Sequence, residues 1–423
     1  MIAHSAALRA DLAALVGEAH VLPATSADAI DGVQPQLVVA PGSAADLARV
    51  LRWANSAGLR VALRGGGSKL DWGNPPAGID VVLLTRRLDR VLEHAWGDMT
   101  ATVEAGCSVA RLQRTLAEHG QRLALDPLWP EQATIGGVLA TNDSGALRAR
   151  FGTLRDLVIG MTIALPDGTL ARSGGKVVKN VAGYDLPKLM TGALGTLGAI
   201  VEATFRLHPL PSATESVRIT CASAAAANEL ILQVLDSTLV PTGVALTAGS
   251  AVSPHIDLRF EGIPAAIQDQ IAKLTAISAS NAPPVAIDAA SWQQRERLWD
   301  AAELALIAKI SVLPTQLAQL AAALERLARP LRLQWRLIAQ ALGAGLLRLD
   351  GANDQVLLTA LSLLRAEIGG LGGSVVVLRC PAALKPRIDV WGTPGDALPL
   401  MRQVKARFDP QAILNPGRYV GGL

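Results

Sequence analysis

The sequence predicts an α+β protein with two domains, and three observations support this fold class. Segments with the patterns of strands and helices alternate up to Pro209-Leu-Pro211, where the regular pattern stops. Beyond this point, alternating strand patterns are interspersed with amphipathic helical ones. The chain has 423 residues, half of them apolar, which is enough for two hydrophobic cores.

The composition excludes several classes of function. Charged residues make up 18% of the chain, the net charge is +3 and long runs of like charge are absent, so nucleic-acid binding is not predicted. The cysteines Cys107, Cys221 and Cys380 are far apart, so neither a zinc site nor an iron–sulfur cluster is predicted. No signal-peptide pattern and no long apolar stretch occur. We therefore expect a cytoplasmic protein that meets the inner membrane only through partners.

The first elements follow from local patterns. Residues 5–16 carry leucine at helical spacing, and residues 37–40 form a short apolar run that predicts a buried strand. Ser43, with Asp46 three residues later, is typical of a helix start, and Gly58 is placed as the cap at the end of that helix.

A glycine loop follows the next predicted strand, residues 59–63. Its sequence is Arg64-Gly65-Gly66-Gly67-Ser68-Lys69. Three adjacent glycines allow positive φ and close approach of a ligand, and consecutive N–H groups in such a turn form an anion site. The loop is either a diphosphate cradle or a plain flexible connection. It is neither a Walker loop nor a Rossmann fingerprint, but it lies at the carboxyl end of a strand, where ligands of α/β sheets bind.

Further strands are predicted over the following stretch, at residues 79–84, 99–104, 156–165, 169–172 and 199–207, with a helix between Ser108 and Gly120. A second glycine-rich passage, residues 134–145, supplies the polar side chains Thr134, Asn142, Asp143 and Ser144. It predicts either a ligand contact or a structural turn followed by a buried helix. A third unusual passage, residues 174–186, places polar groups among apolar ones.

The middle of the chain predicts an antiparallel sheet with helices on one side. Strands are expected at 255–260, 331–338, 345–349 and 374–378, and helices at 230–239, 265–277, 315–327 and 355–368. Its arginines and tryptophans either line a pocket for a carboxylate or are ordinary strand-face and surface residues: Arg297, Trp299, Trp335, Arg336, Arg348 and Arg379.

Five motifs in this order resemble the vanillyl-alcohol-oxidase (PCMH-type) FAD-binding superfamily. They are R-G-G-G-S-K at 64–69, T-I-G-G at 134–137, K-N-V-A-G-Y-D-L at 179–186, G-A-L-G-T-L-G-A-I-V-E-A at 192–203, and F-D-P with I-L-N-P-G-R at 408–418. Within the superfamily, G-G-K-V-V-K-N-V-A-G-Y-D-L at 174–186 looks most like the FAD-binding subunit of bacterial glycolate oxidases. The likeness covers about residues 35–211 and 400–423, and the middle resembles the family's cap region only loosely.

The resemblance implies FAD as the cofactor and assigns contacts to particular residues. The diphosphate would be held by Arg64, Gly65, Gly66, Gly67, Ser68 and Lys69. The diphosphate and ribityl chain would face Ile135, Gly136 and Gly137, with Thr134 beside them. The flavin would lie near Asn142, Ser144 and Gly145, with Gly152 as a further cofactor-binding candidate. Ile200 would contact the adenine side, and Asn415 and Arg418 would close over the flavin.

Arg418 has two interpretations on the sequence alone. An arginine near a flavin can stabilise the anionic reduced ring by its charge. The alternative is a surface arginine that follows a Pro-Gly turn.

Two departures from the superfamily bear on function. The glycine loop has Ser68-Lys69 and no histidine that could link FAD covalently, so non-covalent FAD is expected. The six histidines, His4, His20, His94, His119, His208 and His255, form no close pair, so no metal site is predicted. A general base for hydroxyl deprotonation is usually histidine. His255 is the one histidine in the expected cap and is interpreted as structural, so no catalytic residue is assigned.

The resemblance also implies a domain plan. We expect an N-terminal helical segment at 1–34, a PCMH-type FAD-binding domain at 35–211 and an antiparallel α+β cap at 212–395. Residues 396–423 would return to the FAD-binding domain.

Three functions stay open. The favoured one is the FAD-binding subunit of a glycolate oxidase-like complex that oxidises a small 2-hydroxyacid, with an iron–sulfur subunit and a paralogous FAD subunit as partners. The second is a standalone FAD-dependent oxidoreductase of a hydroxyacid or alditol. The third is a non-catalytic module in which flavin only relays electrons.

Overall fold

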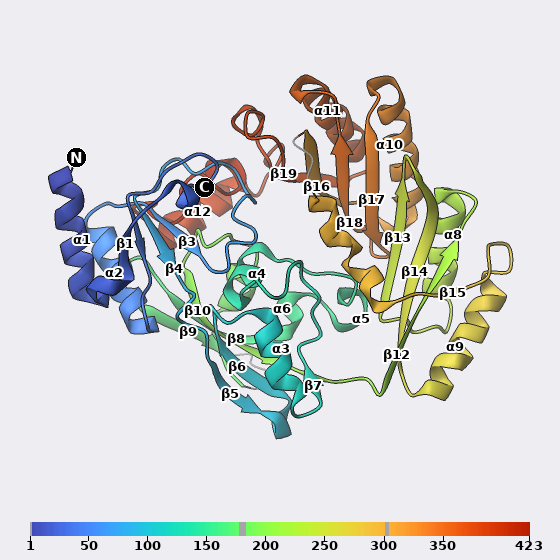
Figure 1. The fold of residues 1–423 in the computed structure, drawn as a ribbon, viewed down its shortest axis with the longest axis horizontal. Helices are drawn as coiled ribbons and strands as arrows, with labels where there is room; N and C mark the ends of the chain where they lie inside the picture. Colours follow the sequence, from blue (N-terminus) through green and yellow to red (C-terminus); the bar gives the residue numbers. More distant parts are fainter. Residues whose placement is uncertain (1, 177–182, 301–303) are drawn as a thin grey trace. The chain divides into compact units, whose positions relative to one another are not determined.

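The structure is a computed structural model that describes residues 2–176, 183–300 and 304–423 (Figure 1). It divides into two compact units. The first unit contains residues 1–144, 153–210 and 393–423, and the second contains residues 145–152 and 211–392. Part of the third unusual passage, residues 177–182, lies outside the described residues.

The first unit begins with a four-stranded sheet of order β1-β2-β4-β3, in which β2, β4 and β3 are parallel and β1 is antiparallel. Its strands are β1 (Val21–Pro23), β2 (Leu37–Val39), β3 (Val61–Arg64) and β4 (Val81–Leu84). The helices α1 (Ile2–Val16) and α2 (Ala44–Ser56) share a core with these strands. The glycine loop therefore leaves the carboxyl end of β3, as the sequence predicts.

Local signals set both ends of α2. The Ser43 hydroxyl accepts a hydrogen bond from the Asp46 N–H at 3.1 Å, which satisfies one of the free donors of the first turn. Gly58, just past the end of the helix, has φ +64°, a conformation that favours glycine. Both predicted ends of this helix are confirmed.

The first unit also contains a five-stranded antiparallel sheet of order β5-β6-β10-β8-β9. Its strands are β5 (Val91–Ala95), β6 (Thr100–Glu104), β8 (Val158–Ala164), β9 (Leu170–Gly174) and β10 (Ala199–Arg206). One core joins this sheet to α3 (Val109–Ala117), α4 (Ile135–Thr141), α6 (Leu154–Leu157) and α7 (Leu186–Met190). A short pair, β7 (Gln121–Arg122) with β11 (His208–Pro209), and the helix α12 (Leu398–Phe408) complete the unit.

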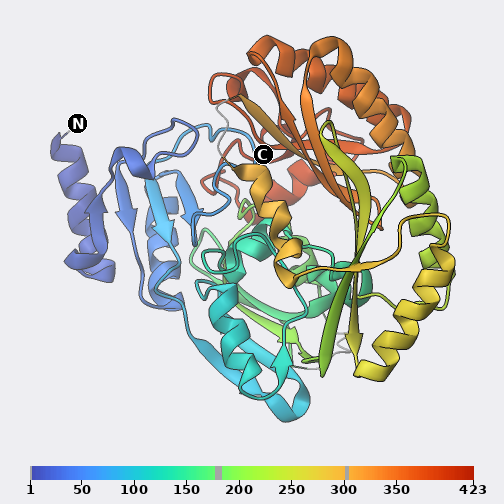
Figure 2. The same ribbon diagram turned by 45° about the vertical axis from the view of Figure 1, so that its right-hand side comes forward.

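The second unit is an eight-stranded antiparallel sheet of order β15-β12-β14-β13-β17-β18-β16-β19. The strands are β12 (Ala213–Thr220), β13 (Gly243–Gly249), β14 (Val252–Gly262), β15 (Val285–Ala286), β16 (Ala305–Ser311), β17 (Gln334–Gln340), β18 (Ala344–Asp350) and β19 (Ser374–Arg379). One apolar core joins the sheet to α8 (Ala224–Asp236), α9 (Pro264–Ile277), α10 (Leu317–Leu331) and α11 (Asp354–Gly370), which line one side of it in Figure 2. The short α5 (Arg148–Phe151) belongs to this unit. The predicted antiparallel α+β arrangement is confirmed.

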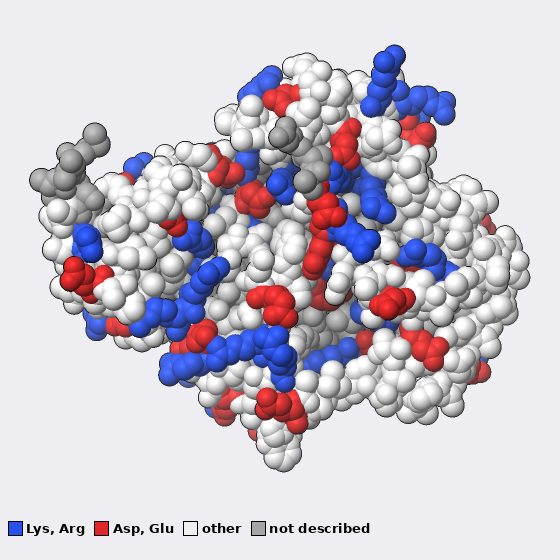
Figure 3. All heavy atoms as spheres, in the orientation of Figure 1, with Lys and Arg blue, Asp and Glu red and all other residues white. Residues whose placement is uncertain are grey.

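No described helix is both long enough and apolar enough to cross a membrane. On the face drawn in Figure 3, basic and acidic side chains often lie side by side. Arg111 with Asp89, and Arg114 with Glu131 at 3.2 Å, are surface ion pairs of this kind. Such exposed pairs contribute little to stability because solvent screens them.

Candidate functional site

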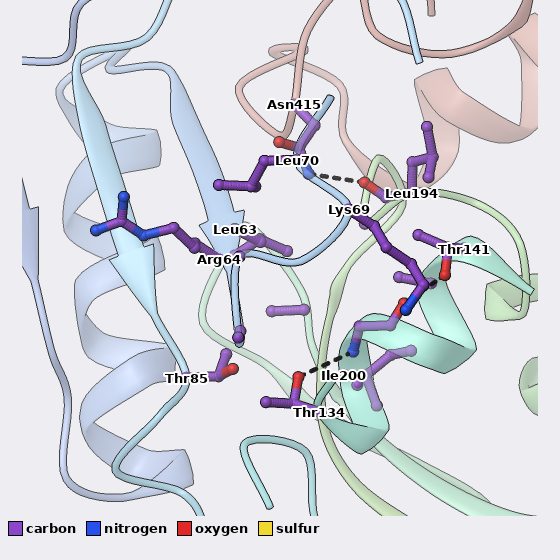
Figure 4. A pocket seen from close by; sticks show the side chains of 18 of the residues that line it. Leu63, Arg64, Lys69, Leu70, Thr85, Thr134, Thr141, Leu194, Ile200 and Asn415 are labelled. Atoms are coloured by element: carbon purple, nitrogen blue, oxygen red, sulfur yellow. Dashed lines mark hydrogen bonds between the residues drawn. The ribbon is translucent and has the colours of Figure 1, made fainter. Parts of the chain in front are cut away.

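A cavity in the first unit collects most of the residues that the sequence singles out (Figure 4). Four segments line it: the end of β3 with the glycine loop, the helix α4, the turn into β10 and the C-terminal segment. Its empty space, including the open mouth, is about 770 Å³.

The three glycines of the loop are required for different reasons. A Cβ built on Gly66 would lie 1.7 Å from the backbone oxygen of Gln132, and one built on Gly65 would lie 2.1 Å from the Thr134 hydroxyl. Gly67 has φ +78°, which side chains rarely adopt. The loop is therefore packed so closely against residues 132–134 that only glycine fits.

Arg86 engages two carbonyl groups of the glycine loop. The Arg86 guanidinium donates hydrogen bonds to the carbonyl oxygens of Gly65, at 3.3 Å, and Gly66, at 3.0 Å. Within the described ranges, the N–H groups of Gly66, Gly67 and Ser68 donate no hydrogen bond to protein. Arg86 does not line the cavity. Consecutive N–H groups without acceptors form the concavity that binds an anion.

The two basic side chains that bracket the loop have acidic partners. The Arg64 guanidinium lies 2.7 Å from the Asp28 carboxylate, and Figure 4 shows this side chain pointing away from Lys69 and Thr134. The pKa of Asp28 lies below its usual value, first because the Thr25 N–H donates to the carboxylate, with Arg64 adding to the effect. Lys69 is buried beside Asp143. Arg64 lines the cavity with its stem while its charge is paired outside it.

The N-terminus of α4 is satisfied by protein. Ile135 and Gly136 donate their N–H groups to Cys107 and Ala105 oxygens at 2.9 and 2.8 Å, and the Thr134 hydroxyl accepts from Gly137 at 3.3 Å. Gly136 and Gly137 line the cavity, whereas Ile135 is buried in the core behind it. This helix therefore contributes a close backbone surface rather than free N–H donors.

Cys107, directly behind α4, is not a reactive nucleophile. Its side chain is fully buried, and burial raises the pKa of the thiol to about 11. At neutral pH the thiol stays protonated, and a protonated thiol is a poor nucleophile and metal ligand.

The residues expected near the flavin occupy different places. Asn142 ends α4 with φ 49°, and neither it nor Ser144 lines the cavity. Gly145 and Gly152 fall in the second unit. Ile200, at the start of β10, does line the cavity.

The C-terminal segment supplies Asn415 to the cavity. Its N–H donates to the Val61 oxygen at 2.9 Å, and its side-chain amide donates to the Leu194 oxygen at 2.7 Å. Asn415 is only 2% exposed, and no described residue donates to its side-chain oxygen Oδ1. A buried acceptor without a donor is rare, and here it lies in the wall of a cavity, which points to a ligand that donates to it.

Arg418 is not a surface residue. It is 4% exposed, and its guanidinium donates to the carbonyl oxygens of Leu70 and Trp72, the latter at 2.7 Å. Burial lowers the pKa of this guanidinium. Arg418 therefore fastens the segment that follows the glycine loop to the C-terminal segment.

The role of Arg418 in joining these two segments can be tested by substitution. Arg418→Ala is expected to leave two buried carbonyl oxygens without donors, with a cost of about 2–5 kcal/mol in the free energy of unfolding and weaker FAD retention. Thermal unfolding and the FAD-to-protein ratio after gel filtration measure both effects. The exposed Arg402, on α12, is the matched control, and Arg402→Ala should change neither. Equal behaviour of the two variants would contradict this role.

Two of the arginines and tryptophans considered for a carboxylate pocket, Arg348 and Trp335, have structural partners. Arg348 forms a two-pronged pair with Asp350, with the closest approach 2.8 Å, and also donates to Leu298 and Asp300 oxygens. The Trp335 indole donates to Glu325 at 3.2 Å. These contacts favour the ordinary strand-face interpretation of both residues.

Sequence reasoning missed several residues of this site. Arg86 and Asp28 hold the loop and its arginine through contacts that no local motif marks. Gly195 and Gly198 line the cavity beside Asn415. Their glycine spacing was visible in the sequence, and Gly195 has φ +68°, so this signal was available.

Comparison with protein families finds two matches. Residues 35–174 match the model for the FAD binding domain, and residues 393–419 match the model for the C-terminal domain of FAD linked oxidases. Together these ranges contain the glycine loop, α4, Asn415 and Arg418.

Three curated relatives each match less than half of this chain. Glycolate oxidase subunit GlcD of Bacillus subtilis is 31% identical over 49% of this chain and 44% of that protein. D-lactate dehydrogenase of Archaeoglobus fulgidus is 35% identical over 41% of this chain and 39% of that protein. D-2-hydroxyglutarate dehydrogenase of Xanthomonas citri pv. viticola is 36% identical over 42% of this chain and 38% of that protein. The chain thus spans less than half the length of these relatives.

Solved structures share the fold. p-Cresol methylhydroxylase with substrate bound has a TM-score of 0.77 at 16% identity and covers 97% of this chain and 95% of that one. Alkyldihydroxyacetonephosphate synthase has a TM-score of 0.70 at 19% identity and covers 91% and 78%. The predicted α+β, PCMH-type fold is confirmed.

Proposed function

Because residues 35–174 form an FAD-binding domain and residues 393–419 an FAD-linked oxidase segment, we propose that this chain is the FAD-binding subunit of a 2-hydroxyacid dehydrogenase complex. The complex would resemble glycolate oxidase and oxidise glycolate or D-lactate to the 2-oxoacid. The names of three relatives support this substrate class: glycolate oxidase, D-lactate dehydrogenase and D-2-hydroxyglutarate dehydrogenase.

The residues of the cavity fit FAD. The N–H groups of Gly66, Gly67 and Ser68, which have no acceptor in the described ranges, suit the diphosphate, and Gly66 has no room for a side chain. Asn415 offers a buried oxygen to a hydroxyl or amide donor of the cofactor. Gly136 and Gly137 allow close approach along α4, and Ile200 gives an apolar contact. When bound, FAD supplies an acceptor for the two electrons of the substrate C–H bond.

The proposal includes partners because the described residues offer no metal cluster through which electrons could pass onward. In the described ranges, no group of three or more His, Cys, Asp or Glu residues is placed to hold a metal ion. We propose an iron–sulfur subunit and a paralogous FAD subunit as partners. The word "subunit" in the name of the Bacillus subtilis relative supports a multi-subunit enzyme.

One observation favours a second candidate, a flavin module that relays electrons without oxidising substrate itself. His255 is the one histidine of the second unit, and its Nδ1 is engaged with the Ser253 oxygen at 2.9 Å. Burial lowers its pKa, which favours the neutral imidazole. Oxidation of a hydroxyacid requires a general base that accepts the hydroxyl proton, and this unit offers a single, buried histidine for that role.

The test uses the purified chain. We expect it to carry FAD, released by acid and identified by chromatography, and to lose its visible absorbance when glycolate or D-lactate is added without oxygen. Bleaching that needs the added partner subunits would instead support the relay. Absence of flavin, even after reconstitution with FAD, would overturn the whole proposal.

A further inference from the structure

A buried ion pair joins the glycine loop to the end of α4. The Lys69 ammonium lies 3.2 Å from the Asp143 carboxylate and also donates to the Leu128 oxygen at 3.1 Å. The two side chains are 5% and 6% exposed. Figure 4 shows Lys69 running from the loop toward α4. Lys69 is among the residues that line the cavity, whereas Asp143 is not.

The surroundings of the pair keep water away from it. The Lys69 ammonium lies 5.8 Å from the centre of the Trp72 ring and 5.4 Å from that of Trp129. Aromatic faces attract a cation, and their bulk removes solvent, so the attraction between Lys69 and Asp143 is only weakly screened. Salt in solution has little effect on such a pair.

Asp143 connects three separate segments. One carboxylate oxygen, Oδ2, faces Lys69 and also accepts a hydrogen bond from the Leu128 N–H at 2.8 Å. Asp143 directly follows Asn142, which ends α4 in the left-handed conformation. The carboxylate therefore ties the glycine loop and the segment around Leu128 to the carboxyl end of α4, and residues of both the loop and α4 line the cavity.

We propose that Asp143 is a positioning residue for a diphosphate ligand: it holds Lys69 so that the glycine loop and α4 form one anion-binding cleft of fixed width. The proposal rests on the proposed FAD site and adds a role for two side chains to it. The loop supplies N–H donors, and Lys69 supplies positive charge beside them. Asp143 keeps the long Lys69 side chain in this one position. Preorganisation of this kind raises affinity because less freedom is lost on binding.

The test compares three variants of the full chain after removal of its flavin. Asp143→Asn and Lys69→Met each leave one buried charge without its partner, and we expect both to bind FAD and ADP-ribose about tenfold more weakly, with Tm lowered by about 5 °C. The double variant Lys69→Met/Asp143→Leu has no buried charge. Its Tm should rise above that of either single variant but stay below that of the natural chain, because the Leu128 N–H and oxygen lose their side-chain partners, while its affinity for both ligands stays about tenfold lower.

Binding is measured by calorimetry and Tm by scanning calorimetry, so neither readout depends on enzyme activity. Lys273→Met on α9, which breaks an exposed pair with Asp269, should change neither quantity. Recovery of affinity together with Tm in the double variant would overturn the proposal and leave the pair a purely structural role. Natural affinity in Asp143→Asn would also overturn it. If the natural chain binds neither FAD nor ADP-ribose, the FAD site itself fails instead.

Discussion

Gly66→Ala is expected to abolish FAD retention while the protein still folds. The new Cβ would lie 1.7 Å from the Gln132 backbone oxygen, so the loop has to move away from residues 132–134. Since hydrogen bonds to charged groups contribute about 1.5–3 kcal/mol each, misalignment of two N–H groups weakens binding about a hundredfold or more. The measurement is the FAD-to-protein ratio after gel filtration, followed by calorimetric titration of the flavin-free chain.

Two controls separate this effect from glycine loss in general. Gly97→Ala places a Cβ in open space at an exposed position, so FAD binding should be unchanged. Gly65→Ala conflicts with a side chain, the Thr134 hydroxyl at 2.1 Å. Adding Thr134→Ala removes that hydroxyl and should recover part of the lost affinity. No side-chain change relieves the conflict at Gly66, because the atom it meets belongs to the backbone. Full FAD retention by Gly66→Ala would contradict the close packing of the loop.

The sequence predicts those features of the fold that depend on neighbours in the chain. The start of α2 at Ser43, its end before Gly58 and the glycine loop after β3 all follow from residues within a few positions of one another. The strands β12, β13 and β16 were not predicted. β13, Gly243–Gly249, is buried along nearly its whole length, so it lacks the alternation that marks a half-buried strand.

The residues of the site divide in the same way, into those that a local motif predicts and those whose contacts depend on distant parts of the chain. The glycine loop and Asn415 were predicted to contact the cofactor, and the structure places both in the cavity wall. The partners of the charged residues were not predictable. Arg418 meets Leu70 and Trp72, which lie more than 340 positions earlier in the chain, and Arg64 meets Asp28 across 36 positions. Such pairings arise from the tertiary fold, and no local sequence pattern predicts them.

Asp409→Asn is expected to give a large loss of stability. The Asp409 carboxylate lies 2.6 Å from the Lys405 ammonium and accepts hydrogen bonds from the N–H groups of Ile413 and Leu414 at 3.1 and 2.8 Å. Lys405 also donates to the Thr196 and Leu414 oxygens. This buried cluster sets the path of the chain toward Asn415. Breaking a buried pair on one side costs about 3–5 kcal/mol, since it leaves a buried charge uncompensated.

The reason for the large effect is that Asn cannot replace all three contacts. One of its two side-chain groups is a donor, so it would face either the Lys405 ammonium or a backbone N–H. Burial already lowers the pKa of Lys405, with Asp409 opposing that shift, so loss of the carboxylate removes what keeps the ammonium charged. Urea unfolding should give the predicted difference in the free energy of unfolding, and FAD binding should weaken because Asn415 loses its support.

Lys405→Met tests this reasoning from the other side. It leaves the Asp409 carboxylate with its two N–H donors but removes the donor to the Thr196 and Leu414 oxygens, so the loss of stability should be of similar size to that in Asp409→Asn. The exposed pair of Lys273 with Asp269 has the same spacing of four residues, and Lys273→Met should cost less than about 0.5 kcal/mol. A loss in Asp409→Asn as small as in Lys273→Met would mean that the F-D-P motif does not anchor the C-terminal segment. Asp409→Asn and Lys405→Met should therefore both lose more stability than Lys273→Met, because each leaves several buried groups without their partners.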